Sequence, residues 1–258
     1  MRLQLFAARA AFAALILALL LAAVAVVGVR LDRLSFGTGL ALMAPATALG
    51  VIALFGALTW LWRAAGRNAG EGKRPGLIAL FGALAFLYVP LSSSWYGLVM
   101  PPITDVSTDT DNPPHFVALA KLRTPQMNPL GFDGQATIPY RGEQRTTSYV
   151  LHEFKNGEIT RPYPRFFPRS EAPVKTLFWR SFETVKRLGW RVAAFSEKDG
   201  RIEATTRSPW FGRVFDIVLE VRPAGAGARV AVRAESRSDR DDHGYALRLV
   251  RKFLAANP

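Results

Sequence analysis

The sequence predicts an α+β membrane protein, in which three N-terminal transmembrane helices precede a domain with a mainly antiparallel four-stranded sheet packed by two helices. Long runs without a charged residue fill the first 100 residues, and the composition beyond them is that of a water-soluble domain. In the second half of the chain, a helical pattern, four strand-like runs and a second helical pattern follow one another. That order favours both helices on one face of an antiparallel sheet.

The three charge-free runs are long enough to cross a bilayer. They contain 20, 29 and 30 residues. A helix needs about 20 apolar residues to cross about 30 Å of hydrocarbon, and a charge at its centre costs about 3 kcal/mol. We expect spans at about 10–29, 40–62 and 76–95, so that residues 1–100 form an anchor and residues 101–258 a domain. Because no charge lies inside a span, an ion path is not expected.

Lys and Arg are distributed unequally around the three runs. Two precede the first run and four lie between the second and third, whereas only two lie between the first and second. Cytoplasmic loops carry the excess of positive residues. The count predicts a bacterial inner-membrane protein with a cytoplasmic N-terminus and a periplasmic or extracytoplasmic domain at 101–258.

Composition limits the chemistry of the domain. The chain has no cysteine, which excludes disulfides, thiolate metal sites and a cysteine nucleophile. Its net charge of +13 divides into +6 for residues 1–100 and +7 for residues 101–258. Nucleic acid is not an expected partner, because an exported domain does not meet it and no recognition motif is present. We expect the membrane itself, anionic lipid or other envelope components, or a membrane protein as partners, and no cofactor.

A seven-residue motif occurs twice in the anchor. Ile52–Leu58 reads IALFGAL, and the same seven letters recur at Ile78–Leu84. The motif is explained either by a duplicated helix, whose glycines permit close helix approach, or by chance in a segment rich in Ala, Leu, Gly and Phe.

The domain begins with an acidic linker between two proline pairs. A short helix is expected at His115–Leu122, and 124–168 reads as loop with short strands. The next helix begins with Ser170 as its cap and ends at Gly189.

Four strands and a helix complete the domain. The strands are Trp190–Glu197, Arg201–Arg207, Arg213–Pro223 and Ala228–Arg237, and the helix is Gly244–Ala256. Asp-Gly before the second strand indicates a hairpin. Alternation in the fourth strand predicts one buried and one wet face.

Three blocks together resemble a bacterial family known as domain of unknown function 1499. They are PPITDVSTDTDNPPHFVAL at 101–119, GWRVAAFSEKDGRIEATTRSPWFG at 189–212 and RVAVRAESRSDRDDHGYALRLVRKFLA at 229–255. Members often carry N-terminal membrane spans. The resemblance implies a fold and a location but no established activity. The chain departs from the family pattern at Arg213–Phe215 and at His243 and Tyr245.

The acidic linker has part of the residue pattern of a calcium-binding loop. Asp105, Ser107, Asp109 and Asp111 occupy alternate positions, but the glycine and glutamate that such a loop requires are replaced by Thr110 and Phe116. We therefore expect no metal. These aspartates are candidates for docking the linker on the domain through hydrogen bonds.

The stretch Ser236–His243 is the second candidate site. It holds a hydroxyl, guanidiniums, carboxylates and an imidazole, which could bind an anionic ligand or form a catalytic set. Its candidate residues are Arg237, Arg240, Asp241, Asp242 and His243. The structural interpretation gives Asp241 or Asp242 the cap of the last helix and pairs the arginines with carboxylates.

The favoured functional hypothesis is a membrane-anchored envelope protein that binds an anionic envelope component or a partner protein. The alternative is a hydrolase of envelope material that uses the Ser236–His243 region, and the sequence favours binding over catalysis.

Overall fold

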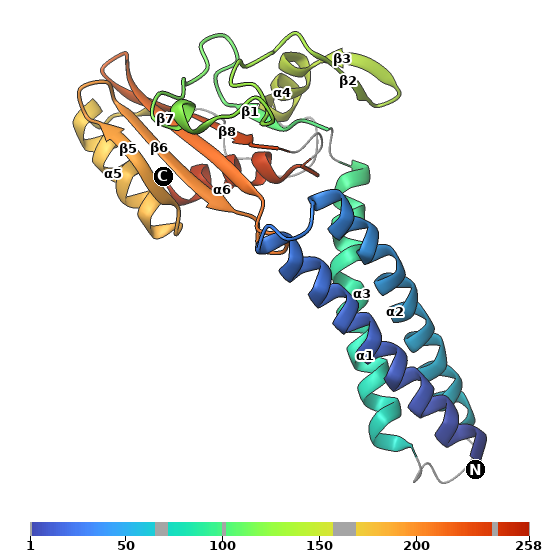
Figure 1. Ribbon diagram of the computed structural model, residues 1–258. Coiled ribbons are helices and arrows are strands. Elements are labelled where there is room, and N and C mark those ends of the chain that lie inside the picture. The colour runs from blue at the N-terminus through green and yellow to red at the C-terminus, as the bar shows by residue number, and fades with distance from the viewer. Residues whose placement is uncertain (1, 65–71, 100–101, 157–168, 239–241, 258) are drawn as a thin grey trace. The chain divides into compact units, whose positions relative to one another are not determined.

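The computed structural model describes residues 2–64, 72–99, 102–156, 169–238 and 242–257 (Figure 1). Two compact units make up the chain. The first holds helices α1 (Arg2–Arg30), α2 (Phe36–Ala64) and all but the last four residues of α3 (Lys73–Val99). All three helices are long and apolar enough to cross a membrane. Each of the three expected spans lies inside one of them.

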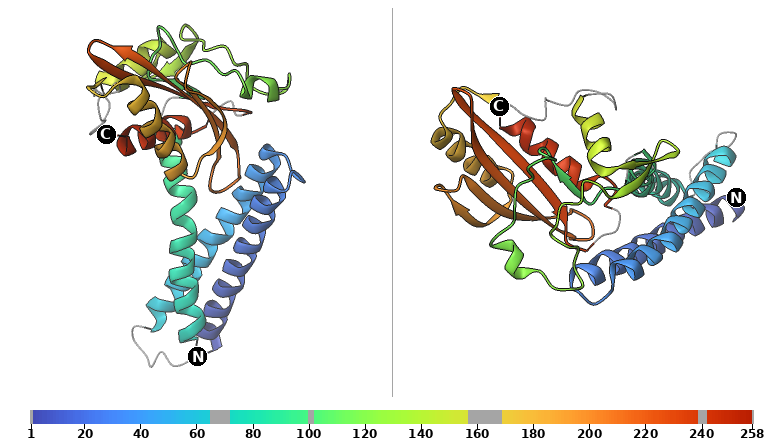
Figure 2. Two further views of the ribbon diagram at one scale, coloured as in Figure 1. Left: turned by 90° about the vertical axis from the view of Figure 1, so that its left-hand side faces the viewer. Right: turned by 90° about the horizontal axis from the view of Figure 1, so that it is seen from above.

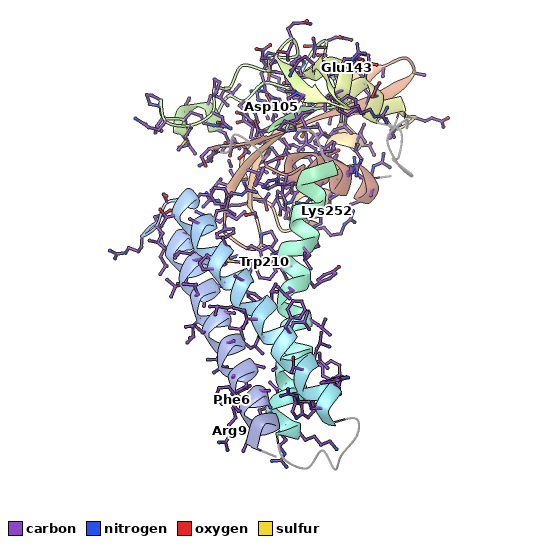
Figure 3. All side chains as sticks on the ribbon, turned by 90° about the vertical axis from the view of Figure 1, so that its right-hand side faces the viewer. Phe6, Arg9, Asp105, Glu143, Trp210 and Lys252 are labelled. Carbon is purple, nitrogen blue, oxygen red and sulfur yellow. The ribbon has the colours of Figure 1, made fainter. Side chains whose placement is uncertain are left out.

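Small side chains pack the three helices together in layers. One layer joins Ala11, Ala57 and Ala79, one from each helix. A second joins Leu15, Ala53 and Ala83 in the same way. Most large apolar side chains of these helices instead point outward; examples are Leu20, Phe55 and Phe81. Side chains on the outside of these helices are drawn in Figure 3.

The repeated motif places equivalent residues against the same helix. Its second and sixth residues are Ala53 and Ala57 in α2, and Ala79 and Ala83 in α3, and all four are fully buried. Its glycines, Gly56 and Gly82, also approach α1: an added Cβ would lie 3.0 Å from Ala11 Cβ and 2.5 Å from Leu15 Cδ2, respectively. The two copies of the motif therefore share not only their sequence but also the residues by which they pack against α1.

The second unit is an α+β domain, as expected. Its helices are α4 (Thr147–Asn156), α5 (Val174–Arg187), α6 (Tyr245–Ala256) and the 3-10 helix η1 (Leu119–Leu122). Its strands are β1 (Asp105–Ser107), β2 (Thr137–Tyr140), β3 (Glu143–Thr146), β4 (Arg169–Ser170), β5 (Arg191–Ser196), β6 (Arg201–Arg207), β7 (Val214–Ala224) and β8 (Gly227–Ser236).

The main sheet is larger than the four strands predicted. It runs β1-β8-β7-β6-β5, with the two-residue β4 also paired to β8, and every pairing is antiparallel. The additional row member, β1, lies in the acidic linker. Three residues are too few to show strand periodicity, so this strand is defined only by its pairing with β8.

Both α5 and α6 cover one face of this sheet (Figures 1 and 2). The core between them contains Phe178 and Phe253 from the helices and Ile217 and Val232 from the strands. Two local expectations fail. Ser170 pairs within the sheet, and Pro173 is the residue before α5. Residues 147–156 form α4, which the sequence did not predict. Gly189, with φ 73°, follows α5 as predicted.

A bulge lies in the edge strand β5. The register shifts between Val192 and Ala194, so that Val192 opposes Ala204 while Phe195 opposes Ile202. Residues three apart would point to opposite faces of a regular strand. Because the bulge inserts one residue, Val192 and Phe195 both lie on the face that α5 covers.

The prediction of a wet face on the fourth strand is wrong. Arg233 and Glu235 of β8 are only 2% and 1% exposed. Residues 110–132, which we call the covering segment, pack on this face: their Phe116 and Leu119 form an apolar cluster with Val218 of β7. The sheet therefore has an apolar face under the helices and a charged face under the covering segment.

Candidate functional site

Three carboxylates lie in one row across the charged face of the sheet. Glu235 of β8 is directly opposite Asp216 of β7 on one side and Asp105 of β1 on the other. Directly paired residues in an antiparallel ladder point to the same face. Like charges in such positions repel one another, so the row needs compensation.

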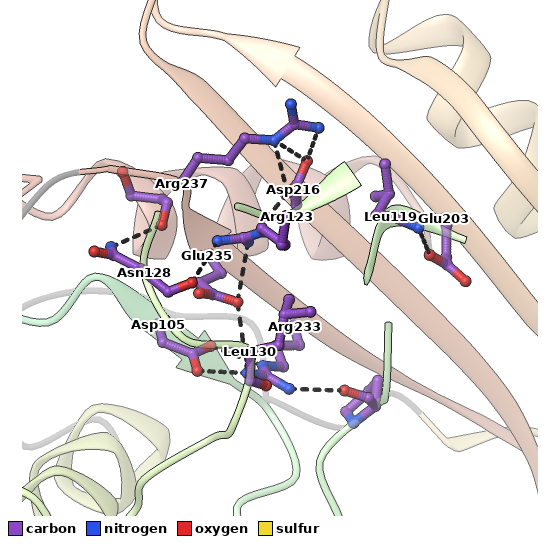
Figure 4. Close-up of polar contacts among 12 residues, drawn as sticks. Asp105, Leu119, Arg123, Asn128, Leu130, Glu203, Asp216, Arg233, Glu235 and Arg237 are labelled. Atoms are coloured by element: carbon purple, nitrogen blue, oxygen red, sulfur yellow. Dashed lines mark hydrogen bonds and ion pairs between the residues drawn. The ribbon is translucent and has the colours of Figure 1, made fainter. Parts of the chain in front are cut away.

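Three arginines supply that compensation (Figure 4). Arg233 Nε and Nη2 donate to the two oxygens of Asp105 at 2.8 and 2.7 Å. Arg237 Nε and Nη2 donate to Asp216 at 2.9 and 2.8 Å. Arg123 of the covering segment places Nη2 3.0 Å from Asp216 Oδ2 and 3.3 Å from Glu235 Oε2. Bidentate pairs of this kind fix geometry as well as charge.

The charge row alters the proton affinity of its acids. Burial, and then the charge of Asp105, raises the pKa of Glu235 to about 8. Burial likewise raises the pKa of Asp105, although Arg233 opposes this shift. Glu235 therefore loses its proton at a higher pH than an exposed glutamate does.

Arg233 and Glu203 attach the covering segment to the sheet. Arg233 also donates to the carbonyl oxygens of Leu130 at 2.8 Å and Pro114 at 3.3 Å. The buried carboxylate of Glu203 accepts the backbone N–H groups of 117–119 at 2.8–3.0 Å. A carboxylate at the start of a helical turn satisfies N–H groups that lack an internal partner.

The linker aspartates differ in their surroundings. Asp105 forms part of β1 and of the charge row. Asp109 is buried, accepts the Asn112 N–H at 3.0 Å and pairs with Arg222 at 3.0 Å and Arg229 at 3.3 Å. Asp111 is exposed.

The residues of the Ser236–His243 candidate separate into different roles. Arg237 pairs with Asp216, as described above. Asp242 is fully buried, and its two oxygens accept the N–H groups of Tyr245 at 3.2 Å and Ala246 at 2.6 Å, which caps α6. His243 is half-buried with a positive φ of 51°. Arg240 and Asp241 lie outside the described residues.

Several of these charged residues were not singled out by the sequence. Arg123 lay in a stretch without periodicity, and Asp216 and Glu203 lay in strands read only for apolar residues. The alternation along the fourth strand placed Arg233 on the face opposite the apolar residues. That face was predicted to be solvated, because the covering segment was not predicted. Among the described residues, no group of three or more His, Asp or Glu side chains could hold a metal ion.

Inside the domain the described charges balance. Eight basic and eight acidic side chains of residues 102–257 are buried or half-buried. They are Arg123, Arg201, Arg213, Arg222, Arg229, Arg233, Arg237 and Arg251, against Asp105, Asp109, Glu153, Glu203, Asp216, Glu220, Glu235 and Asp242. The positive excess of the domain is therefore not an interior feature.

The exposed surface carries the excess. Twelve basic residues and seven acidic ones are exposed in the described part of the domain. Six of the twelve lie on α5 and α6, where the only exposed acid that the structure describes is Glu183. These six, which we call the basic face, are Lys175, Arg180, Lys186, Arg187, Arg248 and Lys252. The two helices are joined by hydrogen bonds from Arg187 to the Ala256 carbonyl and from Asn257 to Ser181.

Together these features define a class of protein: three helices of membrane-spanning length, followed by an α+β domain with a closed, charge-paired sheet face and a basic helical face. A family described as "Protein of unknown function (DUF1499)" matches residues 105–256. This match covers more than half of the chain, and the protein belongs to that family, as the three sequence blocks indicated. No curated protein and no solved structure gave a significant match.

Proposed function

We propose that the protein is a membrane-anchored envelope protein whose domain binds an anionic envelope component or an anionic partner protein through the basic face. The observation that carries this proposal is the distribution of charge. Interior charges balance, while α5 and α6 expose six basic residues and one acidic residue. A surface with one predominant sign attracts ligands of the opposite sign and raises their association rate.

Binding is favoured over hydrolysis of envelope material. A nucleophile must have a base within hydrogen-bonding reach and access to substrate. Ser236 is fully buried, and both oxygens of Asp242 accept backbone N–H groups of α6. The Ser236 hydroxyl therefore lacks access to a substrate, and the Asp242 carboxylate already has structural partners.

The proposed location is the bacterial inner membrane, with the N-terminus cytoplasmic and residues 101–258 outside the cytoplasm. The distribution of Lys and Arg around the spans supports it. Reporter fusions after Leu91 and after Pro258 are expected to behave as exported. Cytoplasmic behaviour of both fusions would reverse the orientation.

The binding proposal can be tested on the full chain held in nanodiscs of neutral phosphatidylcholine, with fluorescent inorganic polyphosphate as a lipid-free anionic probe. Changing Lys175, Lys186 and Lys252 together to Gln removes three positive charges from the basic face. If each contributes about 1 kcal/mol, the affinity should fall about 150-fold at low salt.

A matched control removes three charges from elsewhere on the domain, by changing Lys121, Arg141 and Arg145 to Gln. These residues are also exposed, and their replacement should change affinity by much less. Equal losses in the two triple variants, or no binding by the unchanged protein, would overturn the proposal.

A further inference from the structure

Three aromatic side chains gather where α5 meets the edge strand β5. Trp179 and Phe182 of α5 lie edge to face, with ring centroids 5.5 Å apart. Phe195 of β5 contacts both, at 6.1 Å from Trp179 and 5.0 Å from Phe182. Trp179 is 38% exposed and Phe195 is 53% exposed. We call these three residues the aromatic cluster.

The bulge in β5 creates this cluster. It turns Phe195 to the α5 side of the sheet, where the rings of α5 can reach it. Because β5 ends the row of strands, Phe195 has no further strand beside it and stays exposed. The bulge thus holds a large apolar side chain at the surface.

Two lysines, each paired with a glutamate, lie beside the aromatic cluster. Lys186 Nζ lies 5.7 Å from the centroid of the Phe182 ring. Lys175 Nζ lies 3.3 Å from Glu197, the same carboxylate that accepts the Trp179 indole N–H at 3.1 Å. The basic face continues from here along α5 and onto α6. Exposed aromatic rings beside lysines and arginines are typical of segments that lie in the interface of a bilayer.

We propose that the aromatic cluster and the basic face together bind the surface of an anionic phospholipid bilayer. This inference rests on the proposed function and names the anionic partner. The lysines and arginines contact headgroup phosphates, and Trp179 and Phe195 enter the boundary between headgroups and acyl chains. A Trp ring is suited to that boundary because it is apolar over most of its surface and carries one polar N–H.

Two observations favour a bilayer over a peptide that would add to the free edge of β5. The bulge interrupts the regular hydrogen-bonding register of that strand, which is a common device against edge pairing. The same chain carries three helices long and apolar enough to cross a membrane, so a bilayer is present at high effective concentration.

The absence of cysteine from the chain permits a site-specific test. The exposed Thr176 of α5 is replaced by Cys and labelled with a fluorophore, and the exposed Ala226 of the β7–β8 turn is labelled in a second, control protein. Each full chain is placed in nanodiscs that contain a lipid with a spin-label quencher on its headgroup. The discs are made from phosphatidylcholine alone or mixed with phosphatidylglycerol.

Quenching at position 176 should be about fivefold stronger in the phosphatidylglycerol discs than in the neutral ones, the effect of about one basic contact. Quenching at position 226 should not differ between them. The double change Trp179→Ala and Phe195→Ala should abolish the difference at 176, while Tyr149→Ala, which removes an exposed aromatic ring elsewhere, should not.

Equal quenching at the two positions, or quenching at 176 that survives the double change, would overturn the inference. Normal polyphosphate binding with no quenching at 176 would overturn the bilayer inference and leave the proposed function standing. Absence of both polyphosphate binding and quenching at 176 would overturn the bilayer inference and the proposed function together.

Discussion

Asp105 and Glu235 lie directly opposite each other on the neighbouring strands β1 and β8, with their carboxyl groups on the same face of the sheet. Arg233 neutralises Asp105 through two hydrogen bonds. Glu235 is almost completely buried between two other acids, and its pKa is raised to about 8. The linker thus joins the sheet at a position where burial raises the pKa of a carboxyl group.

The raised pKa of Glu235 predicts that the domain loses stability as the pH rises. Below about pH 4.5, Glu235 is protonated in both the folded and the unfolded state. Between that value and about pH 8, only the folded state holds the proton, so the free energy of unfolding falls with increasing pH. Denaturant unfolding of the full chain in detergent, followed by circular dichroism across this range, measures the slope.

The change Glu235→Gln removes this titration. The variant should show a much smaller slope between about pH 5 and pH 8 and should exceed the unchanged protein in stability above about pH 8. Glu183→Gln, on the exposed side of α5, serves as the control and should retain the slope. A Glu235→Gln protein with the original slope would show that another group is responsible.

Replacement of Arg233 is expected to cause a large loss of stability, because this residue of β8 holds both β1 and the covering segment. Arg233→Met leaves Asp105 and Glu235 buried without this partner, and breaking a buried pair costs about 3–5 kcal/mol. Arg233→Lys keeps the charge but not the two parallel hydrogen bonds, so an intermediate loss is expected. The free energy of unfolding gives both values.

An exposed arginine provides the comparison for Arg233. Arg145 pairs with Glu143 at the surface, where such a pair contributes about 0–1 kcal/mol. If Arg145→Met and Arg233→Lys cost the same, the bidentate contact is not important. If Arg233→Met prevents folding, the lysine variant still permits this comparison.

Replacement of Glu203 is expected to loosen the covering segment locally. Its two oxygens accept three backbone N–H groups, whereas the amide of Glu203→Gln offers one oxygen and no charge. Loss of such a buried contact costs about 1–3 kcal/mol. Hydrogen exchange at residues 117–119 should accelerate more than exchange in α5. Equal acceleration in both would indicate global destabilisation and contradict the capping role.

The sequence predicted the elements whose pattern is local. The four long strands and the last helix were all placed within a few residues, since each repeats its own periodicity. The 3-10 turn was predicted as part of a longer helix, and α4 was not predicted. Strand β1 has three residues, and only its partner β8 makes it a strand.

The charged face of the sheet could not be predicted for a related reason. Its row is formed by β1, β7 and β8, and Arg123 joins it from a segment without periodic pattern. A charged residue in a strand normally indicates a solvated face. Only the three-dimensional position of the covering segment converts Arg233 and Glu235 into interior groups. Part of the basic face has a local pattern, because Arg248 and Lys252 lie between the buried apolar residues of α6 and are exposed.

Close contact between α1 and α2 at Gly56 predicts that this glycine cannot be enlarged. An added Cβ would lie 3.0 Å from Ala11 Cβ and 3.5 Å from Ala11 Cα, and neither atom can move without the helix. Gly56→Leu should therefore separate the helices at a cost of about 1–3 kcal/mol. Gly37→Leu is the matched control, because a Cβ added at Gly37 would meet no atom closer than Ser35 Oγ at 3.9 Å. Thermal unfolding in detergent should show a lower midpoint for the first variant only, and equal midpoints would mean that α1 and α2 do not depend on this contact.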